Sequence, residues 1–114
     1  MLKKTYRIKK NKEFVRTYKK GKVFFSPSIV MYAVNNEKTE TRFGFSVSKK
    51  VGNAVFRNRV KRKLREICRL NMHKIKGGYD IIIVARAIAA SKKYSEILIE
   101  TEKLFNKAKV IIIE

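Results

Sequence analysis

The residues best suited to chemistry in this sequence are the basic side chains between Lys49 and Arg69. This stretch holds nine Lys or Arg residues and a single acid, Glu66. Arginine outnumbers lysine from Arg57 to Arg69, and its planar guanidinium suits paired hydrogen bonds to phosphate and stacking on bases better than an ammonium does. The stretch therefore indicates contact with a nucleic acid.

Helical spacing places these side chains on one side of a helix that follows the turn at Gly52 and Asn53. At about 100° per residue, the polar residues share an arc of about 140°. They are Arg57, Asn58, Lys61, Arg62, Arg65 and Arg69. An apolar set that can pack on a core falls near another side. It comprises Phe56, Val60, Leu64, Ile67, Asn71 and Met72.

Two interpretations of this basic helix are open. Like charges four residues apart, such as Arg57 and Lys61, repel each other by roughly a few tenths of a kcal/mol per pair. A solvated charged face is the usual explanation for charge on a helix, but such faces normally mix Glu with Lys. Because that mixture is missing, we favour a surface whose repulsion is offset by a bound nucleic acid.

The sequence offers little to a protein catalyst. The only histidine, His73, has no Cys or acid at the spacing of a metal site, so we predict no metal ligands. The close acid pairs Glu37/Glu40 and Glu100/Glu102 have the character of a loop and a solvated helix end, not of a two-metal nuclease site. We predict no catalytic residues.

Composition limits which class of binding partner and which cellular compartment we expect. The 114 residues, 45% of them hydrophobic, predict one folded domain. The formal net charge of +20 calls for a polyanion, nucleic acid first and an anionic membrane surface second. The lone Cys68 fits a reducing compartment. No apolar run reaches the length of a signal peptide or a membrane span, so we expect a soluble, cytoplasmic protein with no membrane partner.

The N-terminal part is expected to form a basic arm and a helix. The arm covers residues 1–10, and its expected attachment points are Tyr6 and Ile8. Asn11 can cap a helix that runs to Lys20, and Gly21 can end it in a left-handed conformation. Within this helix lies a cluster of Phe14, Val15 and Tyr18. Core packing is the usual meaning of such an aromatic pair, and a binding role is the alternative.

Alternating apolar residues predict two strands, over residues 28–34 and 42–47, joined as an antiparallel hairpin. One face of this pair could form the floor of a groove lined by Val30, Tyr32, Gly44 and Ser46.

A continuous β-branched run over residues 79–85 predicts a central strand, parallel to the strand before the basic helix. The basic helix is expected to run to about residue 74, and a last amphipathic helix covers residues 94–108. The tail, residues 110–113, could add a short strand, and it would be an aggregation hazard if exposed.

The basic stretch also resembles the Arg-Asn-Arg signature of the bacterial ribonuclease P protein subunit. The residues that carry the likeness run Lys49-Lys50-Val51-Gly52-Asn53-Ala54-Val55-Phe56-Arg57-Asn58-Arg59-Val60-Lys61-Arg62. The resemblance extends over nearly the whole chain, through residues 6–14 and 43–48 before the signature and residues 79–86 after it.

This resemblance implies a fold. It is an α+β two-layer sandwich with elements in the order α-β-β-β-α-β-α and a four-stranded mixed sheet, like the second domain of a small-subunit ribosomal protein. The βαβ crossover through the signature helix is expected to be left-handed, which composition could not predict because about 98% of such crossovers are right-handed. One RNA-binding domain would span residues 1–114, with the signature and basic helix in residues 49–74.

The resemblance also implies a function. The family member assembles with a catalytic RNA and takes part in the removal of the 5′ leader from precursor tRNA. The RNA performs the magnesium-dependent hydrolysis and holds most of the magnesium ions, while the protein binds the leader and strengthens metal and substrate binding. We expect no activity of the protein alone, no protein partner and a monomer in the complex.

Site residues follow from the match to the family signature. The positions that face the catalytic RNA are Arg57, Asn58, Arg59, Lys61, Arg62 and Arg65, with Arg69 on the same stripe and phosphate contacts from Lys49 and Lys50. The cleft for the single-stranded leader matches Phe14, Tyr18, Val30 and Tyr32, with Ser46 on the groove floor. The resemblance thus favours base stacking over core packing for Phe14 and Tyr18.

Two departures and two alternatives accompany this interpretation. The loop Ser26-Pro27-Ser28 is less polar and basic than the family leads us to expect, and the tail is apolar. A structural RNA-binding protein of ribosomal type would share the charge and topology but would not depend on a leader. A self-sufficient nuclease would have to hydrolyse RNA without an RNA subunit.

Overall fold

The computed structural model describes residues 4–112 and contains three α-helices and four strands in the predicted order. These are α1 (Asn11–Lys20), β1 (Lys22–Phe25), β2 (Ile29–Asn35), β3 (Arg42–Ser46), α2 (Ala54–Asn71), β4 (Tyr79–Ala85) and α3 (Tyr94–Lys107). Short 3-10 turns flank them, including Lys49–Val51 before α2 and Met72–Lys74 after it. The boundaries predicted for the helices and for β4 agree with these to within a few residues.

The four strands form one mixed sheet in the order β1-β2-β4-β3. β4 is parallel to β3, as predicted, and antiparallel to β2. The predicted hairpin of β2 and β3 is therefore wrong, because β4 lies between them. The true hairpin joins β1 to β2. Ile81, Ile82 and Ile83 are all fully buried, so β4 is covered on both faces and takes a central place in the sheet.

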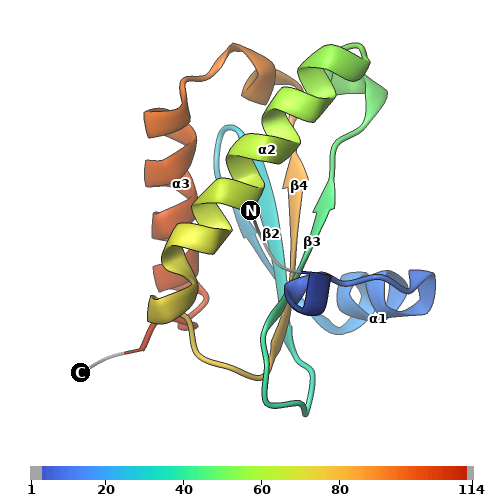
Figure 1. Cartoon of the computed structure of the whole chain (residues 1–114), viewed down its shortest axis with the longest axis vertical. Helices are drawn as coiled ribbons and strands as arrows, with labels where there is room; N and C mark the ends of the chain where they lie inside the picture. The colour runs from blue at the N-terminus through green and yellow to red at the C-terminus, as the bar shows by residue number, and fades with distance from the viewer. Residues whose placement is uncertain (1–3, 113–114) are drawn as a thin grey trace.

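Two layers build the main core. Figure 1 shows α2 and α3 on one side of the sheet and the shorter α1 on the other. We call the side under α2 and α3 the inner face; its buried residues include Ile29, Met31, Phe43, Ile81 and Ile83. The opposite side is the outer face. The crossover from β3 through α2 to β4 is left-handed, as expected for the family fold.

The start of α2 follows directly from its sequence. Gly52 has a φ of 147°, a conformation that side chains rarely adopt, and a Cβ there would also lie 3.0 Å from the Cβ of Phe56. The Oδ1 of Asn53 then accepts hydrogen bonds from the N–H groups of Val55 and Phe56, which caps the helix. Beyond this turn, Val60, Leu64, Ile67, Cys68 and Asn71 are buried. Phe56, which was expected on the buried side, is instead 43% exposed.

The ends of α1 differ from the predicted ones. The N-cap is Lys10, whose N–H donates to the Glu13 carboxylate, and Asn11 is the first helical residue. Gly21 ends the helix with a φ of −73°, so it is not left-handed. Glycine is needed there for space, because a Cβ would lie 2.5 Å from the carbonyl oxygen of Thr17 and 3.2 Å from that of Ala33.

The arm and the tail are both attached to the body. Ile8 is buried, its N–H donates to the carbonyl of Phe43, and Arg7 bridges to the same residue beside the free edge of β3. Tyr6 packs against the core as expected. At the other end, Ile111 forms an isolated bridge with Ile75 instead of extending the sheet. Residue 113 of the predicted tail strand lies outside the described residues.

No helix within residues 4–112 is both long enough and apolar enough to span a bilayer.

Candidate nucleic-acid interface

The predicted RNA-facing residues gather on α2 and on the 3-10 turn before it. We call them the basic helix surface: Lys49, Lys50, Arg57, Asn58, Arg59, Lys61, Arg62, Arg65 and Arg69. Most are exposed, while Arg57, Lys61 and Arg65 are half-buried along the boundary with the core residues of α2. The first turn of α2 contains no acid, so the positive end of the helix dipole adds to the field of these cations.

Contacts within the chain divide this surface into engaged and available groups. Arg69 pairs with Glu66 one turn before it, so part of its hydrogen-bonding capacity is used inside the protein. The guanidinium of Arg59 lies 5.8 Å from the centre of the Phe56 ring. The Nε atoms of Arg57 and Arg65 are buried, and within the described structure neither has a hydrogen-bond partner. A buried donor without an acceptor costs about 1–3 kcal/mol, and because these two Nε atoms are buried, a ligand at the surface does not reach them.

The predicted leader-binding residues share the outer face of the sheet. The register pairs Tyr32 with Ile82 and Ile82 with Gly44 in one row, and pairs Val30 with Val84 and Val84 with Ser46 in the next. Strand β4 thus lies between the groove-floor residues of β2 and those of β3, which share one face of the sheet without being direct neighbours.

Helix α1 crosses this face and contributes the two aromatic residues. A Cβ at Gly44 would lie 2.7 Å from Cε1 of Phe14, so the ring of Phe14 rests directly on the backbone of β3. Tyr18 is 38% exposed, and its ring meets that of Tyr32 edge-on, with 4.9 Å between centroids. Phe14 and Tyr18 therefore pack on the sheet and remain partly accessible, so core packing and a binding role are compatible for this pair.

Sequence reasoning missed two further outer-face residues. Val84 lies between Val30 and Ser46, and it is only half-buried. Phe25 lies opposite Val30 on β1 and is 65% exposed. The apolar run that contains Phe25 was visible, but its face could be assigned only once the register with β2 was known.

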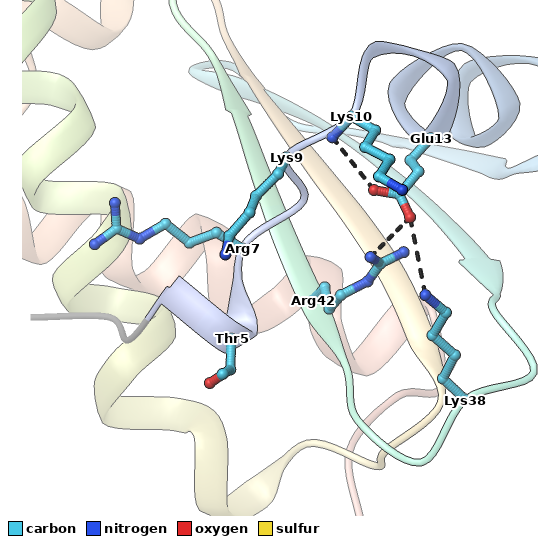
Figure 2. A pocket seen from close by; sticks show the side chains of 7 residues that line it. All are labelled: Thr5, Arg7, Lys9, Lys10, Glu13, Lys38 and Arg42. Atoms are coloured by element: carbon cyan, nitrogen blue, oxygen red, sulfur yellow. Dashed lines mark hydrogen bonds and ion pairs between the residues drawn. The ribbon is translucent and has the colours of Figure 1, made fainter.

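An ion-pair network fixes α1 to the sheet. Arg42 on β3 donates to both carboxylate oxygens of Asp80 on β4, at 3.0 and 2.8 Å, and its other terminal nitrogen lies 2.8 Å from a carboxylate oxygen of Glu13 on α1. Asp80 is only 2% exposed and also accepts a hydrogen bond from Asn36. Figure 2 shows Arg42, Lys38 and the backbone of Lys10 converging on Glu13.

The cavity beside this network is basic but partly neutralised. It has a volume of about 190 Å³ and lies between the arm, α1 and the loop that carries Lys38. Glu13 supplies its only carboxylate among the lining residues, and Arg7 points away from that carboxylate (Figure 2). Because Arg42 already holds Asp80 and Glu13, its charge serves the attachment of α1.

The loop that departs from the family expectation is anchored by α3. Ser28 is fully buried, and both its N–H and its hydroxyl donate to the Glu100 carboxylate at 2.7 Å. Burial opposes the ionisation of Glu100, but hydrogen bonds from Ser26 and Ser28 outweigh it and lower the pKa of this carboxyl. The loop residues are used to hold the β1–β2 hairpin in place.

Comparison with known proteins gives consistent results. Residues 2–109 match the family model described as Ribonuclease P. A protein named ribonuclease P protein component from Clostridium acetobutylicum is 47% identical over 111 residues, which cover 96% of this chain and 93% of the relative.

Solved structures agree with the sequence comparison. The ribonuclease P protein of Staphylococcus aureus superposes with a TM-score of 0.87 at 42% identity, covering 94% of this chain and 98% of that one. The ribonuclease P protein of Thermotoga maritima gives a TM-score of 0.81 at 27% identity, covering 89% and 96%.

The network at Glu13 predicts a pH-dependent stability. Burial raises the pKa of Glu13, but hydrogen bonds from Arg42 and from the backbone of Lys10 outweigh it and bring the pKa below the ordinary value of 4.5. A lowered pKa in the folded state stabilises the protein above the ordinary value, and this contribution is lost as pH falls through the folded-state pKa.

We therefore expect Glu13→Gln to lower the free energy of unfolding at neutral pH, and the difference from the wild type to shrink as the pH falls below about 4.5. Urea unfolding across this pH range measures both proteins. Glu40→Gln, in the exposed loop after β2, removes the same charge and serves as the control. A difference between Glu13→Gln and wild type that stays constant with pH would contradict the network.

Proposed function

Because the chain belongs to the ribonuclease P protein family, we propose that it binds both the catalytic RNA of ribonuclease P and the 5′ leader of precursor tRNA. As a ribonuclease P protein component it is part of a tRNA-processing ribonucleoprotein. The basic helix surface would contact the catalytic RNA, and the outer face beside α1 would take the single-stranded leader.

The chemical difference between these two surfaces is the observation that supports the proposal most. The basic helix surface offers charge and guanidinium donors, such as those of the exposed Arg59 and Arg62, which suit a phosphate backbone. The outer face offers partly exposed aromatic and apolar groups, such as Tyr18 and Tyr32. Aromatic rings stack on any base, so this face suits leaders whose sequences differ.

Magnesium chemistry is assigned to the RNA subunit. Among the described residues, no three His, Cys, Asp or Glu side chains lie together in a way that could hold a metal ion. Asp80, the most buried acid, is already neutralised by Arg42. In the proposed assembly the protein lowers the magnesium requirement by neutralising phosphates around the RNA-held ions.

Cleavage of precursor tRNA tests the proposal directly. At low magnesium and moderate salt, bacterial ribonuclease P RNA should cleave the precursor efficiently only when this protein is added, and the protein alone should not cleave. Protein that binds RNA but never stimulates cleavage would favour a structural RNA-binding role. Cleavage by the protein alone would place the catalytic site in the chain itself.

The outer face predicts leader-dependent binding. Phe14→Ala combined with Tyr18→Ala should weaken binding of precursor tRNA to the assembled complex by about 30-fold or more, since each of two stacked bases contributes roughly 1–3 kcal/mol. Binding of mature tRNA and assembly with the catalytic RNA should change little. Equilibrium binding of both tRNAs measures this, with Tyr18→Ala alone as the milder variant because Tyr18 is partly exposed. An equal loss of affinity for mature tRNA would show that the leader does not bind to this face.

The basic helix surface predicts a magnesium effect. Arg59→Ala or Arg62→Ala should weaken assembly with the catalytic RNA by about 10-fold, the scale of one charge-assisted hydrogen bond, and should raise the magnesium concentration needed for cleavage. Lys103→Ala removes the same charge from an exposed position on α3 and should change neither. A magnesium profile that is unchanged in both arginine variants would refute this role.

A further inference from the structure

One large apolar side chain remains unexplained by folding. Phe25, the last residue of β1, is 65% exposed, more than any other exposed large hydrophobic side chain in the described structure. Its neighbour Phe24 packs against the core, so strand alternation itself turns Phe25 to the outer face. An exposed aromatic ring beside other apolar groups is characteristic of a binding surface.

Phe25 completes a row across the sheet. The register pairs Phe25 with Val30, Val30 with Val84, and Val84 with Ser46, one residue from each strand. At about 4.8 Å between neighbouring strands, the row is about 14 Å long from β1 to β3. Val30 and Ser46 belong to the predicted leader-binding residues, so Phe25 continues that same surface to the far edge of the sheet.

Helix α1 leaves this row uncovered. The ring of Phe14 lies over Gly44 and Tyr18 meets Tyr32, both in the next row of the outer face. Toward the opposite end of the strands, Glu13 binds Arg42. The helix therefore covers the part of the sheet beyond Gly44, and Phe25 and Val30 lie on the open side of Tyr18.

The turn that carries Phe25 is held from several directions. Both the N–H and the hydroxyl of Ser26 donate to the carbonyl of Ile29. Arg86 donates to the carbonyl of Ser26, and Ser28 is bound by Glu100 of α3. Because this backbone is fixed before any ligand arrives, binding at Phe25 orders little more than one side chain.

The charge around Phe25 favours RNA as the occupant. Arg86 is exposed and held against the same turn. With a formal net charge of +20 on the whole chain, a second copy would be repelled. A flat apolar ring beside a cation suits a base with its flanking phosphate.

From these observations we infer that Phe25 is a base-stacking position for single-stranded RNA at the β1 edge of the outer face, reached only by leaders long enough to pass Tyr32 and Val30. This inference rests on the proposed function, because it extends the proposed leader site. The affinity of the complex for precursor tRNA then depends on leader length, with a separate increase in affinity when the leader reaches β1.

A graded series of leader lengths tests the inference in the assembled ribonucleoprotein. Wild-type affinity should rise with leader length in two stages, and Phe25→Ala should remove only the second, lowering the affinity for long leaders by about 5-fold or more. Mature tRNA and short leaders should bind as before, and Phe25→Trp should restore the second stage. Ile99→Ala, at a 54% exposed position on α3, is the matched control.

A second measurement reports stacking without relying on affinity. 2-Aminopurine placed along a long leader should be quenched at the position that reaches Phe25, and the quenching should be lost in Phe25→Ala. Persistence of quenching at every position in this variant would overturn the inference.

The outcomes separate this inference from the proposed function. If the Phe14 and Tyr18 double variant loses leader binding while Phe25→Ala keeps the full length dependence, the extension alone is wrong. If wild-type complex binds mature tRNA as well as any precursor, both are wrong. If Phe25→Ala abolishes self-association of the free protein and leaves leader binding unchanged, the face belongs to a second copy and the extension is overturned.

Discussion

The ion pair between Arg42 and Asp80 is the constraint on which the outer face depends. A carboxylate with 2% exposure is tolerated only when it is paired and hydrogen-bonded. Arg42 meets this need with a two-point contact, and its remaining nitrogen reaches Glu13. One guanidinium therefore joins α1, β3 and β4, which are far apart in the sequence. Because it holds α1 by its first turn, it also determines which part of the sheet the helix covers and which part stays open.

Much of the fold could be predicted from local patterns, and the errors have identifiable causes. Periodicity located α1, α2, β4 and α3, and the turn at Gly52 and Asn53 marked the start of α2. The prediction of the strand order failed because two strands joined by a short loop were assumed to pair. β2 and β3 are neighbours in sequence, yet β4 lies between them in the sheet. The unbroken apolar run of β4 already required cover on both faces, and neighbours on both edges would have followed from it. The left-handed crossover came only from family resemblance, since backbone geometry favours the opposite hand.

The candidate site was predictable as a set of residue types, but not as a surface. The arginines of α2 follow from helical spacing, and the structure adds that Arg69 is partly engaged by Glu66, while Arg57 and Arg65 each keep a buried donor that has no partner within residues 4–112. Phe25 needed the register with Val30 before its face was known. The Arg42 network needed three-dimensional contacts between distant segments, because no local pattern links positions 13, 42 and 80.

The two proposed surfaces are physically different, and β3 joins them. Its outer-face residue Ser46 is followed within a few residues by Lys49, Lys50 and the capped start of α2. Electrostatic attraction to phosphates is long-ranged and weakened by salt, whereas stacking on aromatic rings is short-ranged and depends little on salt. In the proposed assembly, the two kinds of contact lie at opposite ends of one short segment, so that charge would hold a large RNA while the apolar face would bind an unpaired strand beside it. β3 is paired with β4 and covered at its free edge by Arg7 and Ile8. The resulting rigidity of β3 keeps the distance between the two surfaces constant.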